Sequence, residues 1–241
     1  MELKRLVLMA VLGLVAAIGP ACENPAPPQD PSVPAFRSHK EFLQMHNSFL
    51  KRAKEGPIGL LFIGDSITQG WTKAADTWAK YYEKYHPANF GNKGDRTQHV
   101  LWRIENGELD GISPKVVVLL IGTNNIATDS AEAITRAEYK IVQAIRARLP
   151  QAKVLVLGIF PRGDLKTGEL SAGAMRKIRE VNAALARLDD GKTVRYLDLT
   201  DKFIVDGKMP IEITPDQLHI SLKAYKIWAE AMQPLLEEMM K

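Results

Sequence analysis

The sequence predicts a single α/β domain, a three-layer α/β/α sandwich around a doubly wound, flavodoxin-like parallel sheet of five strands. Short apolar runs, typical of strands buried on both faces, alternate along the 241 residues with amphipathic stretches of helical spacing. Strands and helices in strict alternation form parallel sheets with helices on both faces. The apolar share of 46% and the charged share of 25% are ordinary for a globular domain, and the length requires only one core.

The predicted elements follow one another in a regular order. A helix that begins near Ser38 precedes the first strand, and a last helix begins at Ser221, with Pro234 expected to kink or restart it. The expected strands are 58–64, 88–91, 115–122, 153–160 and 194–199, with helical patterns between them at about 73–85, 97–106, 130–149 and 171–189. Three pairs have capping-box spacing: Ser38 with Glu41, Asp95 with Gln98, and Asp129 with Glu132.

The N-terminus predicts export. Two basic residues precede 13 uncharged residues, 6–18, and this stretch is too short to span a membrane but typical of a secretory signal. We expect residues 1–21 to be a signal peptide and the protein to be periplasmic or at the cell surface. Two endings stay open: cleavage after Ala21, or lipidation of Cys22 to give a lipoprotein anchored to a membrane. Residues 22–37 are proline-rich and predict a semi-rigid tether, so the domain is expected to cover 38–241.

Charge and cysteine content exclude several classes of protein. The formal net charge of +4 is spread over many residues of both signs, which does not favour a nucleic-acid partner. A single cysteine permits no intrachain disulfide. The five histidines show no metal-ligand spacing, so we expect neither a metal nor a cofactor.

Polar motifs follow three of the predicted strands. The first strand ends in FIGDSITQG (62–70), and the next two end in NFGNKGD and LIGTNN. Ligands of doubly wound sheets bind outside the carboxyl ends of the strands, where these motifs converge. A serine nucleophile needs a base and a group that orients the base. His219, three residues after Asp216 in a loop before the last helix, is expected to meet Ser66 there.

These motifs resemble, in order, the four sequence blocks of the SGNH or GDSL hydrolases. The segment from 89 to 125 is similar to the catalytic subunits of the platelet-activating-factor acetylhydrolase Ib type. The resemblance implies that Ser66 is the nucleophile, His219 the general base and later the acid, and Asp216 its orienting partner. The backbone N–H groups of Ser66 and Gly94 and the side-chain amide of Asn124 would form the oxyanion hole. It further implies a serine esterase that cleaves short-chain, notably acetyl, esters of a small molecule, glycan or lipid.

Other interpretations of the same residues stay open at this point. Ser66 alone is typical of a helix cap or turn, and Asp65 is expected to brace the loop through backbone hydrogen bonds. Asp65 as a phospho-accepting carboxylate is an alternative, as is a non-catalytic, surface-tethered glycan-binding module. An α/β-hydrolase elbow requires G-x-S-x-G, whereas Thr68 occupies its last position. Within the resembled family, a lysophospholipase or thioesterase is a further alternative.

Overall fold

The computed structural model describes residues 29–164, 167 and 169–241. The expected signal peptide at 1–21, Cys22 and the first part of the expected tether lie outside the described residues. Within the described part of the chain, no helix has the length and apolar character needed to span a membrane.

The centre of the molecule is a five-stranded parallel sheet, as the sequence predicts. The strands are β1 (Leu60–Gly64), β2 (Pro87–Gly91), β3 (Val116–Leu120), β4 (Lys153–Leu157) and β5 (Val194–Leu197), in the order β2-β1-β3-β4-β5. Gly64 pairs in register with Gly91 on one side and Leu120 on the other, so β1, β2 and β3 end at the same level. The segments that follow these three strands therefore leave one edge of the sheet together.

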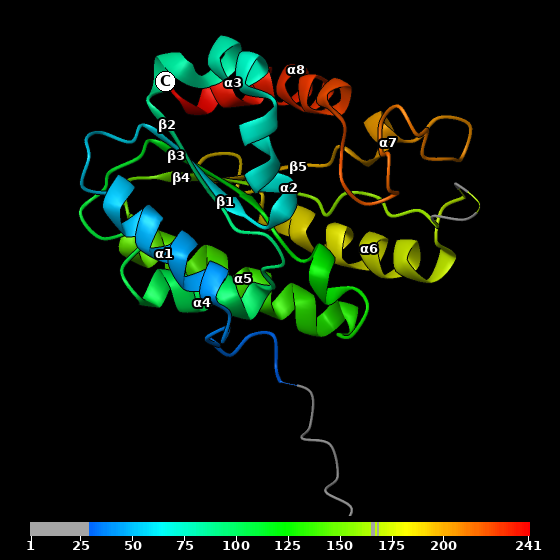
Figure 1. Cartoon of the computed structure of the whole chain (residues 1–241), viewed down its shortest axis with the longest axis horizontal. Coiled ribbons are helices and arrows are strands. Elements are labelled where there is room, and N and C mark those ends of the chain that lie inside the picture. The colour runs from blue at the N-terminus through cyan, green and yellow to red at the C-terminus, as the bar shows by residue number, and fades with distance from the viewer. Residues whose placement is uncertain (1–28, 165–166, 168) are drawn as a thin grey trace, which may run out of the picture.

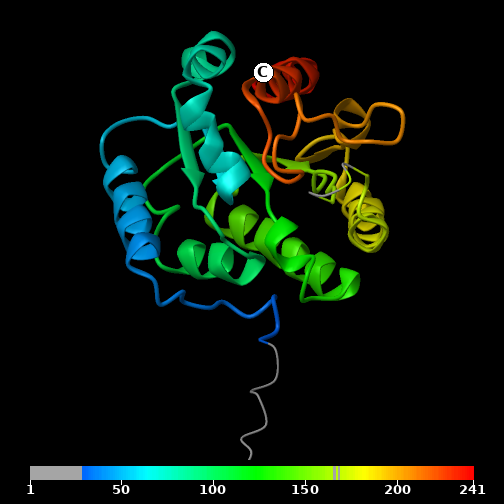
Figure 2. The ribbon, with the colours of Figure 1, turned by 45° about the vertical axis from the view of Figure 1, so that its right-hand side comes forward.

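Helices cover both faces of the sheet (Figures 1 and 2). One layer holds α1 (Lys40–Arg52), α4 (Thr97–Glu105), α5 (Ala131–Arg148) and α6 (Ala172–Leu185), and the other holds α3 (Ala75–Tyr82), α7 (Thr200–Phe203) and α8 (Leu222–Met239). The short helix α2 (Ser66–Gln69) directly follows β1. Alternate residues of each strand face opposite layers, so Leu61 and Ile63 pack in one core and Leu60 and Phe62 in the other.

The packed part of the chain begins before Ser38, where the tether was expected to end. The Thr97 hydroxyl donates to the Pro31 carbonyl (2.9 Å), and the Ala35 amide donates to the Gln98 carbonyl (3.0 Å). Ala35 itself is 5% exposed. A proline-rich composition correctly indicates extended backbone without helix, but it does not exclude contacts with the domain. Residues 30–37 therefore lie on α4 rather than apart from the domain.

Local signals at helix ends were less accurate than the strand pattern. The N-caps are His39 for α1, Arg96 for α4 and Ser130 for α5, each one residue after the expected cap. Only the Ser130 side chain accepts a bond from the first turn in the ordinary way, from the Ala133 amide (3.1 Å). Helix α8 runs through Pro234 without restarting, because the buried residues on either side hold it against the sheet.

Candidate active site

Ser66 lies at the sharp turn between β1 and α2. Asp65 caps α2, and its Oδ1 accepts a hydrogen bond from the Ile67 amide (2.9 Å), which is the bracing role expected for this residue. A Cβ on Gly64 would lie 2.3 Å from the Leu120 carbonyl oxygen, so only glycine fits between the strands here. The turn places the Ser66 side chain, half-buried, at the carboxyl edge of the sheet.

The structure brings His219 and Asp216 to this serine. Ser66 Oγ lies 3.0 Å from His219 Nε2, and His219 Nδ1 lies 2.6 Å from Asp216 Oδ2. An ionised carboxylate only accepts, so Nδ1 carries the proton and Nε2 accepts from the serine hydroxyl. The three side chains thus form one continuous hydrogen-bonded chain across 153 sequence positions.

A tight turn fixes Asp216 beneath the imidazole. Its second oxygen, Oδ1, accepts from the backbone amides of Leu218 (3.1 Å) and His219 (2.6 Å), and Gln217 between them has a left-handed φ of 60°. Partial burial opposes ionisation, but the hydrogen bonds from His219 and the backbone outweigh it and hold the pKa of Asp216 below its ordinary value. The carboxylate stays charged at neutral pH and can stabilise a protonated imidazole.

The other two expected residues occupy the ends of the neighbouring strands. Gly94 follows β2 with φ of 77°, a conformation that favours glycine. Asn124 follows β3 in the 3-10 helix η3 (Thr123–Asn125), and its Nδ2 donates one hydrogen to the Asp95 carbonyl (2.8 Å). The second Nδ2 hydrogen is available for a ligand, and the Gly94 amide has no acceptor among the described residues.

Arg37 also contributes to the candidate active site, and the sequence did not predict this role. Its Nη1 donates to the Lys93 carbonyl (2.8 Å) and lies 3.9 Å from Asp95 Oδ1. The guanidinium also covers Gly94: a Cβ there would lie 2.8 Å from Nη1. Arg37, which lies in the segment expected to be a tether, therefore holds the loop that carries Gly94. Composition gives no signal for such a contact, because it depends on how distant segments pack.

A buried ionic cluster supports the same loop from below. The Arg103 side chain is fully buried, and its Nε donates to Asp95 Oδ2 (2.8 Å). Its Nη1 pairs with Glu108, whose other oxygen lies 2.7 Å from His46 Nδ1. Burial raises the pKa of Asp95 to about 6, and the neighbouring Arg103 charge limits the rise.

Two further acids are buried beneath the turn at Ser66. Burial, with a smaller contribution from the Asp95 charge, raises the pKa of Asp65 to about 7, and burial raises the pKa of Glu138 well above its ordinary value. Asp65 is 1% exposed, which leaves its carboxyl inaccessible to a phosphoryl donor. The alternative in which Asp65 is the reactive carboxylate therefore has no support in the geometry.

Ser66 opens into a pocket of about 600 Å³, lined by Ser66, Gln69, Gly70, Thr72, Lys73, Lys93, Pro215, Asp216, His219 and Ile220. A neighbouring pocket of about 610 Å³ shares Gln69 and Lys93 with it and reaches Gly94 and Arg37. The Lys93 amide donates to Gln69 Oε1 (3.0 Å) at the junction between the two.

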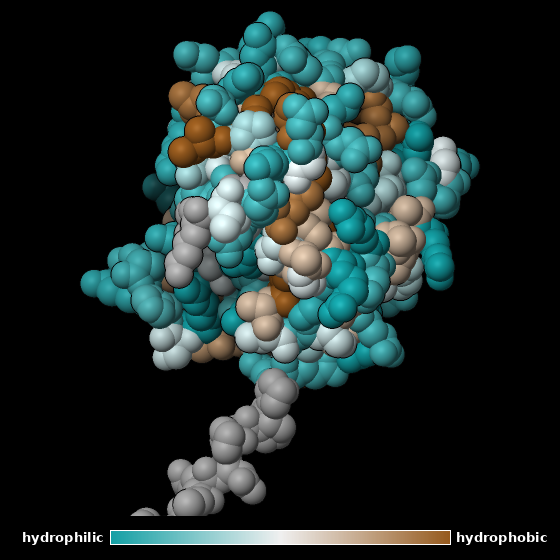
Figure 3. All heavy atoms as spheres, turned by 90° about the vertical axis from the view of Figure 1, so that its right-hand side faces the viewer, coloured by the Kyte–Doolittle hydropathy of each residue, from teal (hydrophilic) through white to brown (hydrophobic). Residues whose placement is uncertain are grey.

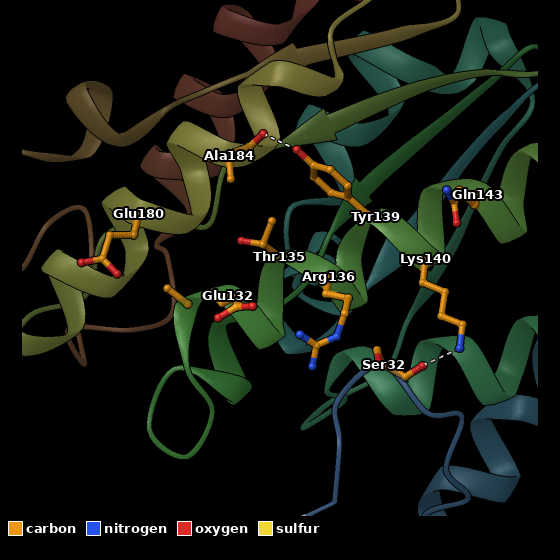
Figure 4. A pocket seen from close by; sticks show the side chains of 10 residues that line it. Ser32, Glu132, Thr135, Arg136, Tyr139, Lys140, Gln143, Glu180 and Ala184 are labelled. Carbon is orange, nitrogen blue, oxygen red and sulfur yellow. Dashed lines mark hydrogen bonds between the residues drawn. The ribbon is translucent and has the colours of Figure 1, made fainter.

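A third hollow, of about 730 Å³, lies between α5 and α6 and is shown in Figure 4. Two of its polar side chains bond to backbone carbonyls: the Tyr139 hydroxyl donates to the Ala184 carbonyl (2.7 Å), and Lys140 Nζ donates to the Ser32 carbonyl (3.0 Å). No histidine or cysteine in the described part of the chain lines this hollow. No group of three or more potential metal ligands occurs among the residues that the structure describes.

The sheet order and the serine, histidine and aspartate at its carboxyl edge are the arrangement expected of an ester hydrolase with an α/β fold. Residues 62–227 match the sequence profile of the GDSL-like Lipase/Acylhydrolase family, and the chain belongs to this family. It is 37% identical over 216 residues to the platelet-activating factor acetylhydrolase IB subunit alpha1 of Homo sapiens, covering 89% of this chain and 90% of that protein.

Solved structures share the fold at lower identity. A GDSL-like lipase from Bacteroides thetaiotaomicron superposes with a TM-score of 0.66 at 19% identity, covering 82% of this chain and 99% of that one. A carbohydrate acetylesterase from Sinorhizobium meliloti superposes with a TM-score of 0.58 at 18% identity, covering 76% and 98%. These structures confirm the predicted fold, and the family match over residues 62–227 confirms the predicted family.

Proposed function

We propose that this protein is a serine esterase in which Ser66 is the nucleophile, His219 the general base and Asp216 the group that orients the base. The observation that carries the proposal is the unbroken chain from Ser66 Oγ to His219 Nε2 (3.0 Å) and from Nδ1 to Asp216 (2.6 Å). A non-catalytic glycan-binding module would not require this arrangement, so the geometry favours catalysis.

The reaction proceeds in two halves. His219 accepts the Ser66 proton as Oγ attacks the ester carbonyl carbon, and the imidazolium then protonates the departing alcohol, leaving an acyl group on Ser66. A water molecule, deprotonated by the same imidazole, attacks the acyl-enzyme and releases the carboxylic acid. The amides of Ser66 and Gly94 and the free Nδ2 hydrogen of Asn124 stabilise the negative oxygen in both halves.

The proposed substrates are short-chain esters, with acetyl preferred. Support comes from the acetylhydrolase name of the Homo sapiens relative and from the carbohydrate acetylesterase fold neighbour. We further propose that the substrate is a glycan or lipid ester met outside the cytoplasm, because the N-terminal sequence is typical of an export signal. Mass spectrometry of the mature N-terminus distinguishes a lipidated Cys22 from cleavage after Ala21.

The test is a panel of p-nitrophenyl esters of increasing acyl length, run with the wild type and Ser66→Ala. We expect the variant to lose turnover at least about 1,000-fold, because no nucleophile remains. Equal turnover in the two proteins would remove the assignment of Ser66. Faster cleavage of octanoate than of acetate would remove the acetyl preference, and adding a thioester and a lysophospholipid separates the two alternatives within the family.

A further inference from the structure

Polar and apolar side chains are divided between the surface and the core, and Glu138 departs from this division. On the side of the molecule shown in Figure 3, hydrophilic residues dominate, and apolar residues occur in small separate groups. Glu138 is instead an acid in the core: it is 0% exposed and lies on the face of α5 that also buries Ile134 and Ile141. A buried carboxylate without a partner is costly, so such a group keeps its proton.

Glu138 lies next to the two segments that carry the proposed catalytic groups. Its Oε1 is 2.7 Å from the position that a Cβ on Gly122 would take, and Gly122 caps η3, two residues before Asn124. The charge of Asp65, the cap of α2 beside Ser66, acts on the Glu138 carboxyl. Glu138 therefore reaches from α5 to both the nucleophile turn and the segment that carries the oxyanion amide.

The two acids have no cation to share within the described residues. Both Glu138 oxygens and Asp65 Oδ2 are buried there without a hydrogen-bond partner. Arg103 is committed to Asp95 and Glu108. The other titratable groups that interact with the pair from neighbouring elements are acids: Asp95 after β2, Tyr196 on β5 and Tyr225 on α8. Burial and the Asp65 charge raise the pKa of Glu138 well above its ordinary value, so Asp65 ionises first and Glu138 stays neutral.

We propose that Glu138 is a positioning residue of the oxyanion hole that works only while it carries its proton. This inference rests on the proposed function. The neutral carboxyl fills the space between Gly122 and the Ser66 turn without opposing the Asp65 charge. Loss of the proton places a second negative charge beside Asp65, and repulsion then drives the carboxylate against Gly122. Gly122 caps η3 and has no side chain that could absorb the movement, so the η3 backbone shifts, and the Asn124 amide with it.

The test is the pH dependence of kcat and KM for p-nitrophenyl acetate from about pH 6 to 10, in buffers where urea unfolding shows each protein to be folded. The wild type should gain activity as His219 loses its proton. It should lose activity again at alkaline pH, by at least about 10-fold in kcat, because removing an oxyanion donor costs about 100- to 1,000-fold and displacing one costs less. KM should change less, since the Asn124 amide is needed most in the transition state.

Two substitutions should change the alkaline loss in opposite ways. Glu138→Gln replaces the carboxyl with an amide of the same shape that cannot ionise, so it should abolish the loss. Asp65→Asn removes the charge that keeps Glu138 protonated, so the loss should move to lower pH by about one unit. Glu132→Gln removes an exposed acid from the same helix and should retain the wild-type profile. A purely structural role for Glu138 would change the free energy of unfolding and leave the shape of the profile as it is.

Infrared spectra test the proton itself, independently of activity. At about pH 8 most Asp65 carboxyls are ionised, because the pKa of Asp65 is about 7. The wild type should then still show the carbonyl band of a buried, protonated carboxyl, and Glu138→Gln should lack that band.

The outcomes separate this inference from the proposed function. An alkaline loss of the same size and midpoint in Glu138→Gln, or a wild type without the loss, would overturn the inference, as would a wild type without the infrared band. Hydrolysis that depends on Ser66 would in each of these cases keep the esterase. Equal hydrolysis by the wild type and Ser66→Ala would instead remove the proposed function, whatever the infrared band shows.

Discussion

Replacing Arg37 with glutamine should weaken catalysis although Arg37 makes no contact with Ser66 or His219. Arg37 Nη1 donates to the Lys93 carbonyl (2.8 Å), and the guanidinium packs over Gly94, whose amide is a proposed oxyanion donor. A hydrogen bond from a charged donor contributes about 1.5 to 3 kcal/mol. The Arg37 side chain is 31% exposed, so the lower end of that range applies. About 1.5 kcal/mol corresponds to a loss of about 10-fold in kcat.

The assay measures kcat and KM for p-nitrophenyl acetate in the wild type, Arg37→Gln and Arg37→Lys, together with urea unfolding of each protein. A positioning role predicts a loss concentrated in kcat, because the donor is needed most in the transition state. Arg37→Lys should recover part of it, since a lysine can still donate to the Lys93 carbonyl. An unchanged kcat in Arg37→Gln, with or without a lower free energy of unfolding, would refute the argument that this residue organises the Gly94 loop.

Two further predictions concern the site and the acids beneath it. Asn124→Ala should lower kcat for p-nitrophenyl acetate by about 100- to 1,000-fold with a smaller change in KM, and a loss below 3-fold would exclude its amide from the oxyanion hole. Because burial raises the pKa of Asp65 to about 7 from an ordinary 3.8, the folded protein holds a proton there that the unfolded chain loses. The free energy of unfolding should therefore fall as pH rises from about 4 to 7, by up to about 4 kcal/mol from this group. Urea unfolding of Asp65→Asn should show a shallower fall, and an equally steep one would assign the pH dependence to other groups.

The strands were predictable because their signal is local and strong. Runs such as VVVLL at β3 are buried on both faces. A short, continuous apolar run of this kind is typical of a strand in a parallel sheet. Which residue caps a helix depends on whether its side chain makes hydrogen bonds elsewhere in the fold. Asp95 has the right spacing to cap α4, but its carboxylate is committed to the buried Arg103, so Arg96 takes the cap position. The spacing of residues along the sequence cannot show that a side chain pairs with a charge elsewhere in the fold instead of capping the nearby helix.

The proposed catalytic residues were predictable for a different reason. In a parallel sheet the strands end at the same edge. The motifs that follow three of the strands, and the loop before α8, are therefore expected to lie together there. Arg37 and Arg103 could not be predicted in the same way. Arg37 lies in a proline-rich segment whose composition describes only its backbone, and Arg103 lies in a helix whose buried face could equally have been apolar. Both act through contacts that exist only once the layers have packed.

Arg103 and Asp95 show why a charged cluster occupies that buried position. Arg103 donates through Nη2 to the Gly64 carbonyl (3.3 Å) at the end of β1 and through Nε to Asp95 (2.8 Å) in the loop after β2. The Asp95 carbonyl in turn accepts from Asn124 (2.8 Å) after β3. Backbone groups at these strand ends must find partners once buried, and apolar side chains cannot supply them. One ion pair therefore links the turn before Ser66, the Gly94 loop and the Asn124 amide, so that the three proposed oxyanion donors are held relative to one another before substrate arrives.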